Sequence, residues 1–421
     1  MKSAKTLREC RDVMQEWSKF FRSGHIWIEL LVQEKPDSSQ NVSQAAKEID
    51  IPETWKVDIP KFEKYISKKK EVDYEGIWEV GDYKIGIQKD GANYIGFIIE
   101  TEVEEWKQQG LVKLKLEQDG DNVKSTYYMR DYSPEESEGK PEWIGNNFLQ
   151  ISDFTLTRLS PVFPDDPFVE NYVKSISTWK PYLEKLNETT LYLRIPSFDF
   201  SEKSAIDSVL SANKDIILKT KNLIIDLRGN GGGFDSSFEG LLPFLYTNPI
   251  RRLGMVYLST SLNNQRMLDF ANTTEYDFNE ETRQWSRESY DTLQSRLGEF
   301  VNVGGQEVYI DTLDTVYEYP KNVGIIIHKE NGSTTEQFLL AAKQSKKVKL
   351  FGVSTWGCID TGNQYSVESP CKEFKLFYSL SRSLRVPDMI IDDIGIQPDY
   401  YLDKTIPQYK WVEFVNDVLN Q

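Results

Sequence analysis

Ser333 lies where a predicted strand meets a predicted helix, in the stretch IIIHKENGSTTEQFLLAAKQ (residues 325–344). Glu336 follows three residues later, so the pair fits the capping box S-x-x-E that begins many helices. A serine at a strand-to-helix bend is also a position from which a nucleophile can project. Both roles use the same Oγ atom, and the local sequence leaves the choice between cap and nucleophile open.

A glycine turn follows a second apolar run in LIIDLRGNGGGF, residues 223–234. Consecutive glycines allow positive φ angles and close approach of another chain. Two backbone N–H groups in such a turn can form an oxyanion hole. The alternative is a plain strand-to-helix turn. A phosphate-binding loop is disfavoured, because neither GxxxxGK[ST] nor GxGxxG is present.

The chain has two histidines, His25 in RSGHIWIEL and His328 at the end of VGIIIH. Each is a candidate general base, and each also fits a structural role. A His₂ metal site would need both, and the cysteines Cys10, Cys358 and Cys371 contain no CxxC pair, so neither a metal nor a cofactor is expected. Cys358 and Cys371 are predicted to be free thiols, with a disulfide between them as the alternative.

The overall charge excludes one class of partner. The 66 acidic residues outnumber the 50 basic ones, which gives a net charge of −16 and a surface that repels phosphate backbones. Nucleic-acid binding is therefore not expected. The sequence contains no run of about eighteen apolar residues that would predict a membrane-spanning helix. The N-terminus reads as a charged helix rather than a signal peptide, which fits either a cytoplasmic protein or a chain whose leader has been removed.

The elements that would position these residues fall into three regions. Residues 1–71 form an N-terminal segment that carries His25, with an amphipathic helix over 3–22 and a strand over 26–33. Residues 72–165 show short alternating runs and hairpin turns such as KDGAN, which predict a small antiparallel β-domain, a barrel or a sandwich. Residues 166–421 alternate strands and helices, which predicts an α/β core with a mostly parallel sheet and a helical insertion at 262–300.

Four motifs occur in the order seen in tail-specific (C-terminal-processing) serine peptidases and their tricorn-core relatives. The motifs are DLRGNGGG, NGSTTEQ, LFGVSTWG and IGIQPDYYL, and the resemblance covers about residues 1–30 and 190–405. It implies a layered core of the ClpP/crotonase type with Ser333 as the nucleophile. It also implies oxyanion donors in the glycine turn and after the serine, at Gly232, Gly233 and Thr334.

One departure from the family pattern separates its two branches. The Ser-Lys branch carries a lysine twenty-five residues after the serine, and Cys358 stands there in this chain. The Ser-His branch takes its histidine from a turn after the N-terminal helix, and FFRSGHIWIEL resembles that turn. The resemblance therefore implies that His25 is the general base. A carboxylate or hydroxyl would orient the ring. Asp360 is the favoured candidate, and the alternatives are Ser23, Asp392 and Asp393.

The prediction is a serine peptidase that hydrolyses peptide bonds of proteins or peptides, with His25 removing the proton from Ser333. One alternative is an inactive peptidase fold that binds a peptide or an apolar ligand, and another is a crotonase-type acyl-CoA enzyme. The β-domain occupies the place of the family's PDZ module but lacks a GLG-like loop, so it gates the cleft, recognises a partner, or serves only as a shield or scaffold. The resemblance implies an exported bacterial protein, periplasmic or surface-anchored.

Overall fold

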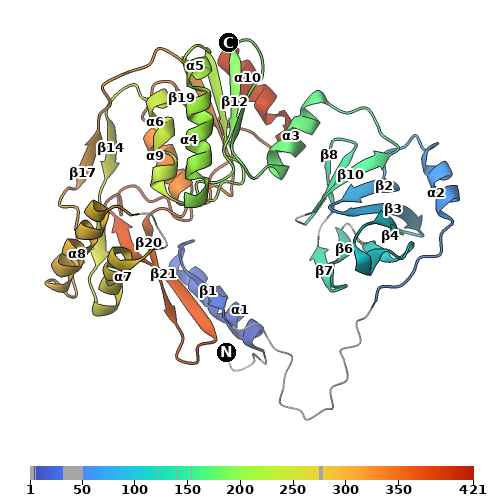
Figure 1. The fold of residues 1–421 in the computed structure, drawn as a ribbon, viewed down its shortest axis with the longest axis horizontal. Coiled ribbons are helices and arrows are strands. Elements are labelled where there is room, and N and C mark those ends of the chain that lie inside the picture. The colour runs from blue at the N-terminus through green and yellow to red at the C-terminus, as the bar shows by residue number, and fades with distance from the viewer. Residues whose placement is uncertain are drawn as a thin grey trace. The chain divides into compact units, whose positions relative to one another are not determined.

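The chain folds into two units, each described here by itself. The computed structural model describes residue 4 and residues 6–31, 51–120, 122–138, 140–152, 154–274 and 278–421. A core unit combines residues 1–39 with 175–421, and residues 40–174 form the second unit, called the β-domain below (Figure 1). Parts of the predicted N-terminal helix, of the strand after it and of the helical insertion lie outside the described residues.

A six-stranded sheet forms the centre of the core unit. Its order is β11-β12-β13-β18-β19-β22, and all neighbouring strands are parallel except the antiparallel pair β11 and β12. The strands are β11 (Tyr182–Lys185), β12 (Thr190–Arg194), β13 (Asn222–Asp226), β18 (Asn322–Ile327), β19 (Val348–Gly352) and β22 (Tyr400–Tyr401). Both the glycine turn and Ser333 follow the carboxyl ends of adjacent strands, β13 and β18, which places them at one edge of the sheet.

Helices cover both faces of this sheet, because its strands are apolar on both sides. Leu223 and Ile225 of β13 lie in one buried cluster with residues of α4 (Lys203–Ala212) and α9 (Thr334–Ala342), whereas Ile224 lies in another with residues of α10 (Trp411–Asn420). This alternation follows from the two-residue period of a strand. The helices of the core unit after β11 are α4 (Lys203–Ala212), α5 (Lys214–Ile217), α6 (Leu242–Leu245), α7 (Ser261–Asn272), α8 (Glu280–Gln294), α9 (Thr334–Ala342) and α10 (Trp411–Asn420), with 3₁₀ turns η3 (Phe200–Glu202), η4 (Asp235–Ser237), η5 (Glu239–Leu241) and η6 (Gln408–Lys410).

A second sheet attaches the N-terminal segment to the core. Helix α1 (Leu7–Ser18) begins at Thr6, whose hydroxyl accepts a hydrogen bond from the Glu9 N–H, and ends in the 3₁₀ turn η1 (Lys19–Phe21). Strand β1 (Trp27–Leu30) then pairs antiparallel with β21 (Phe374–Ser383). The stacked rings of Trp27 and Phe377, with centroids 4.5 Å apart, strengthen this pairing.

The same sheet extends toward the helical insertion. Strand β21 also pairs with β20 (Thr361–Glu368) and with β15 (Met255–Leu258), which pairs with β16 (Phe300–Val301). The predicted strand in RRLGMVYLST is two strands, because β14 (Ile250–Leu253) pairs with β17 (Val308–Asp311) in a separate sheet. The insertion predicted at 262–300 contains the helices α7 and α8.

The β-domain is one nine-stranded antiparallel sheet of order β7-β6-β5-β4-β3-β2-β10-β9-β8. Its elements are α2 (Ile59–Ile66), β2 (Gly76–Val80), β3 (Tyr83–Asp90), β4 (Asn93–Thr101), η2 (Glu104–Trp106), β5 (Val112–Asp119), β6 (Asn122–Tyr128), β7 (Pro134–Glu138), β8 (Glu142–Ile144), β9 (Phe148–Ile151) and β10 (Phe154–Ser160), followed by α3 (Pro167–Ser177). The sheet curls around its core, since Tyr127 of β6 stacks on Phe154 of β10 at 4.3 Å although four strands separate them in the sheet. It is thus an open barrel and not a two-sheet sandwich.

The boundary of this domain lies earlier than the sequence predicted. The sequence predicts that residues 1–71 belong to the N-terminal segment, but α2 packs its Phe62 and Ile66 against Ile77 and Phe97 of the sheet. Thr54 also bridges to Leu111. None of the helices within the described residues is long and apolar enough to cross a membrane.

Candidate active site

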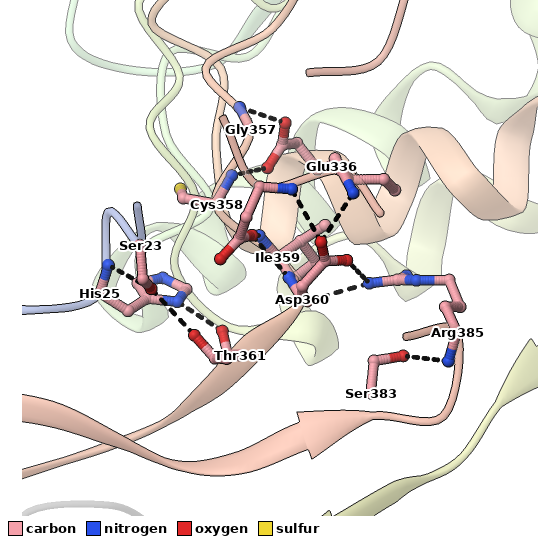
Figure 2. Close-up of polar contacts among 12 residues, drawn as sticks. Ser23, His25, Glu336, Gly357, Cys358, Ile359, Asp360, Thr361, Ser383 and Arg385 are labelled. Atoms are coloured by element: carbon pink, nitrogen blue, oxygen red, sulfur yellow. Dashed lines mark hydrogen bonds and ion pairs between the residues drawn. The ribbon is translucent and has the colours of Figure 1, made fainter. Parts of the chain in front are cut away.

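Ser333 and His25 meet although 308 residues separate them in sequence. The Nε2 atom of His25 lies 3.1 Å from Ser333 Oγ. On the other side of the ring, His25 Nδ1 lies 2.6 Å from the backbone oxygen of Thr361 (Figure 2). A carbonyl oxygen only accepts hydrogen bonds, so Nδ1 must carry the proton. In the neutral ring Nε2 is then unprotonated and can accept the proton of the serine hydroxyl.

The backbone at Ser333 has the strained geometry of a projecting serine. Its φ is 54° and its ψ is −124°, a region that costs a non-glycine residue about 1–3 kcal/mol. Its side chain caps none of the described N–H groups of α9, and Glu336 does not reach back to the start of the helix. The capping-box interpretation is therefore wrong in this structure, and the Ser333 hydroxyl faces His25 instead.

The ring of His25 is only 6% exposed and is positioned by β1, which begins two residues later on the edge of β21. Ser23 is a predicted alternative for orienting the ring, and its side chain contacts Thr361 and the His25 backbone. Its hydroxyl is 3.0 Å from Thr361 Oγ1 and accepts a hydrogen bond from the His25 backbone N–H at 3.3 Å. Ser23 thus joins the histidine turn to the residue whose carbonyl orients the ring.

Asp360, the favoured orienting residue, does not contact the ring. One carboxylate oxygen accepts hydrogen bonds from the N–H groups of Ile391 (2.7 Å) and Asp392 (2.8 Å), and the other lies 3.3 Å from Arg385 (Figure 2). Because Asp360 immediately precedes Thr361, these bonds fix the carbonyl that His25 meets. The orienting group is a backbone oxygen, which a search for carboxylate or hydroxyl side chains misses.

Asp392 completes the electrostatics around the histidine. Its carboxylate accepts hydrogen bonds from the N–H groups of Ile359 and Asp360 at 2.7 and 2.8 Å. Burial raises the pKa of Asp392, and the attraction of His25 is among the effects that oppose this rise. Among the described residues, Asp392 thus binds the turn before Thr361 and makes no hydrogen bond to the His25 ring. Asp393, the remaining alternative, lies 3.9 Å from Arg22.

The glycine turn approaches the serine as closely as its sequence predicts. Gly232 has φ 115°, and a Cβ there would lie 2.9 Å from the Ser333 Cβ and 2.8 Å from the Gly332 oxygen. However, the Gly232 N–H donates to Asn230 Oδ1 at 3.1 Å and is not free for an oxyanion. Within the described part of the chain, the N–H groups of Gly233 and Thr334 have no protein acceptor. These two remain the available donors.

Three residues that sequence reasoning did not single out tie this turn to the serine turn. Asn230 Oδ1 accepts a second hydrogen bond, from Thr335 Oγ1 at 2.7 Å. Asn331 Nδ2 donates to the backbone oxygens of Leu227 (2.6 Å) and Asn230 (3.0 Å). All three polar side chains are fully buried, so each bond replaces hydration that the fold has removed. The asparagine of the DLRGN motif was a signal that could have identified this network.

The Asp-x-Arg part of the same motif anchors the end of β13. The buried carboxylate of Asp226 accepts hydrogen bonds from Arg228 Nε at 3.0 Å and from the Tyr192 hydroxyl at 2.8 Å. Burial alone would raise the pKa of Asp226, but the charges of Arg228 and Arg194 hold it well below its usual range. The pair is ionised and hydrogen-bonded, and it fixes the start of the glycine turn.

Glu336 stabilises the turn at 355–358, and the loop that carries His25 packs against this turn. Its buried carboxylate accepts hydrogen bonds from Thr355 Oγ1 at 2.5 Å and from the N–H groups of Gly357 and Cys358 at 2.8 Å each (Figure 2). Burial raises the pKa of Glu336, and these hydrogen bonds oppose the rise. Gly24 packs directly on this turn, since a Cβ there would lie 2.7 Å from the Cys358 Cβ.

The remaining candidate residues lie outside the Ser333–His25 pair. His328 has its Nδ1 3.6 Å from Glu330 Oε2, and its ring lies against Trp411. Cys10, Cys358 and Cys371 are all free thiols, so the alternative disulfide is absent.

A cleft of about 1360 Å³ opens around Ser333 and His25, entirely within the core unit. The glycine turn, η1, the turn at 356–360, β20 and the helical insertion all contribute to its walls. The cleft thus brings together a hydroxyl with an imidazole and two N–H groups that have no acceptor among the described residues. This combination is that of a serine hydrolase.

Comparison with known proteins identifies the class. The model of peptidase family S41 matches residues 189–402, and the chain belongs to this family. It is accordingly a serine-type peptidase that acts on peptide or protein substrates. None of the curated proteins matches the chain significantly.

Several solved structures are similar in fold. Mature CPAF complexed with lactacystin aligns at a TM-score of 0.49 and 13% identity, over 97% of this chain and 87% of that one. A peptidase structure from Parabacteroides merdae aligns at 0.39 and 17% identity, over 65% of this chain and 77% of that one. The photosystem II D1 C-terminal processing protease aligns at 0.38 and 11% identity, over 99% of this chain and 87% of that one.

Proposed function

We propose that this peptidase uses a Ser-His mechanism, with Ser333 as the nucleophile and His25 as the general base. The observation that carries the proposal is the pair of contacts on the imidazole, 3.1 Å to Ser333 Oγ and 2.6 Å to the Thr361 oxygen. A serine hydroxyl is a weak nucleophile near neutral pH, and a positioned imidazole accelerates its attack by roughly 10²–10⁴-fold.

The steps follow from the hydrogen-bonding groups. Ser333 Oγ attacks the peptide carbonyl carbon while its proton moves to His25 Nε2. The N–H groups of Gly233 and Thr334 donate to the oxyanion of the tetrahedral intermediate. The intermediate collapses as Nε2 returns the proton to the leaving amine, and an acyl-serine remains. Water then attacks the acyl group by the same route, with His25 again as the base, and releases the carboxylic acid and free Ser333.

The Thr361 carbonyl can accept the Nδ1–H of His25 both before and after the proton transfer, so the ring keeps its orientation through the reaction. Cys358, in the place of the Ser-Lys branch's lysine, offers no competing base. Burial, and then the nearby Glu336, raise the pKa of its thiol to about 12, so the thiol is neutral at pH 7.

Two finer points belong to the same proposal. The parallel sheet with helices on both faces supports a layered core of the ClpP/crotonase type. The exported location that the resemblance implies stays a prediction, to be checked by fractionating the source cells.

Serine-directed labelling tests the mechanism. A fluorophosphonate should label wild-type protein at a single serine that peptide mass spectrometry assigns to Ser333. Ser333→Ala should abolish the label, and His25→Ala should slow labelling by about 10²–10⁴-fold.

His328→Ala is the matched control, because it removes the other histidine, and it should keep most of the wild-type labelling rate. A protein that keeps its fold but takes no label would be a binding protein on a peptidase scaffold. Loss of labelling in His328→Ala but not in His25→Ala would transfer the base to the other histidine.

A further inference from the structure

The cleft carries more basic than acidic side chains, although the chain as a whole is strongly acidic. Among the described residues, its walls contain five basic and three acidic ones, whereas the net charge of the chain is −16. The basic residues are Lys19, Arg22, Arg252, Arg266 and Arg385, and the acidic ones are Asp235, Asp360 and Asp393. A basic cleft in an acidic protein favours an anionic group on the ligand.

Four of the five basic side chains already have a carboxylate partner. Arg385 is 3.3 Å from Asp360 and Arg22 is 3.9 Å from Asp393. The other two pairs are Arg252 with Asp311 at 2.5 Å and Lys19 with Glu16 at 2.5 Å. Each of these four cations therefore already has a carboxylate beside it within the protein.

Arg266, on α7 of the helical insertion, is the exception. Its guanidinium has no hydrogen bond or ion pair with any described residue, and its Nε is buried without an acceptor. The nearby carboxylate of Asp269, one helical turn later, accepts hydrogen bonds from Gln265 at 3.3 Å and from the Tyr365 hydroxyl, and forms no ion pair with Arg266 among the described residues. A buried donor without an acceptor is costly, so this is a group that a ligand can satisfy.

Aromatic rings hold Arg266 in place without neutralising it. Its guanidinium lies 4.1 Å from the ring centroid of Phe270 and 5.9 Å from that of Tyr365. Rings that stack on the guanidinium leave its edge available for an in-plane acceptor such as a carboxylate. Trp285 of α8 also lines this end of the cleft and is 41% exposed.

The strand β20 sets the distance between Arg266 and the reacting atoms. It begins at Thr361, which accepts the hydrogen bond from His25, and it carries Tyr365 four residues later beside Arg266. At a strand rise of about 3.3 Å per residue, these two positions are roughly 13 Å apart. An extended peptide covers that distance with about four residues.

We propose that Arg266 binds a carboxylate of the peptide substrate about four residues from the bond that is cleaved. This inference rests on the proposed function, whose site it extends. The carboxylate can be the free C-terminus of the substrate or an acidic side chain, since both present the same pair of oxygens to the guanidinium.

A degenerate peptide library in three forms tests the inference. The free-acid library keeps all carboxylates, C-terminal amidation removes only the terminal one, and methyl esterification removes them all. The measurement is the rate at which new amino termini appear with wild-type protein, Arg266→Gln and Arg287→Gln. Arg287 is the matched control, because it is an exposed arginine on α8 that pairs with Glu280 and does not line the cleft.

Wild-type protein and Arg287→Gln should cleave the free-acid library at least about tenfold faster than the esterified one, in line with one charge-assisted contact. Arg266→Gln should cleave both at similar rates, while its fluorophosphonate labelling stays at the wild-type rate. A low rate on the amidated library would assign the carboxylate to the C-terminus, and a high rate would assign it to a side chain. An equal preference in Arg266→Gln and wild-type protein would overturn the inference.

A binding measurement separates this inference from the catalytic proposal. Immobilised Ser333→Ala protein should retain free-acid peptides over esterified ones, and Ser333→Ala/Arg266→Gln should not. If wild-type protein neither labels nor cleaves but the retention differs as stated, the catalytic proposal fails and the carboxylate site stands. If cleavage occurs without any carboxylate preference, the site fails and the catalytic proposal stands.

Discussion

Substituting Gly24 by alanine should displace His25, the proposed general base. The added Cβ would lie 2.7 Å from the Cys358 Cβ and 3.0 Å from the Trp356 ring. Non-bonded carbon atoms prefer separations of about 3.5–4.0 Å, so the two segments must move apart by roughly 1 Å. Gly24 immediately precedes His25, and the movement is therefore passed directly to the ring.

We expect the loop that carries His25 to move, while the turn around Cys358 stays in place. Glu336 holds the turn around Cys358 through three hydrogen bonds of 2.5–2.8 Å, and the thiol is buried. A shift of about 1 Å would lengthen the 3.1 Å contact between His25 Nε2 and Ser333 Oγ beyond hydrogen-bonding distance. A misplacement of this size costs about 100-fold in rate.

The assay is the second-order rate constant of fluorophosphonate labelling, with thermal unfolding measured alongside to verify the fold. Gly362→Ala is the matched control, because its new methyl group would meet nothing closer than the Ser381 hydroxyl at 4.0 Å. The double variant Gly24→Ala/Cys358→Gly removes the atom that the new methyl group meets and should recover part of the rate. Labelling of Gly24→Ala within about threefold of wild type would refute the idea that this contact sets the histidine position.

Two further predictions concern buried charges. Glu336→Gln replaces a carboxylate that accepts three hydrogen bonds with an amide whose NH₂ must face a donor, so it should lower the free energy of unfolding by about 2 kcal/mol and slow labelling of Ser333. Equal denaturation midpoints for variant and wild type would contradict this. In the β-domain, burial lowers the pKa of Lys113 from 10.5 to about 7, with its Nζ 3.8 Å from the Tyr83 ring centroid. Between pH 7 and pH 10.5 the unfolded chain binds more protons at Lys113 than the folded one. The free energy of unfolding should therefore rise with pH, by up to about 1.4 kcal/mol per pH unit. Hydrogen exchange of the β5 amides at pH 7 and 9, corrected for intrinsic rates, should show this rise in wild-type protein and lose it in Lys113→Met; the same slope in both would exclude Lys113 as its source.

The bend at Ser333 and the glycine turn can both be predicted from the sequence, because each depends on a short local segment. An apolar run followed by glycines or by N-G-S specifies a buried strand and a bend within a dozen residues. The alternation that marks β2 to β6 is equally local, and the structure contains those strands. The sequence does not predict that the β-domain begins before residue 72. Helix α2 belongs to this domain only through contacts with strands elsewhere in the chain, and the sequence of the helix does not reveal those contacts.

The sequence by itself determined which residue types could do chemistry, and with only two histidines it restricted the choice of base to His25 or His328. Only the tertiary structure decided which of them lies beside Ser333, and it is His25. The orienting group is the backbone oxygen of Thr361, and every residue has such an atom, so composition cannot reveal it. Glu336 turns from the helix start to the turn at 355–358 because that turn supplies three buried donors, and these exist there only once strands distant in sequence have packed together.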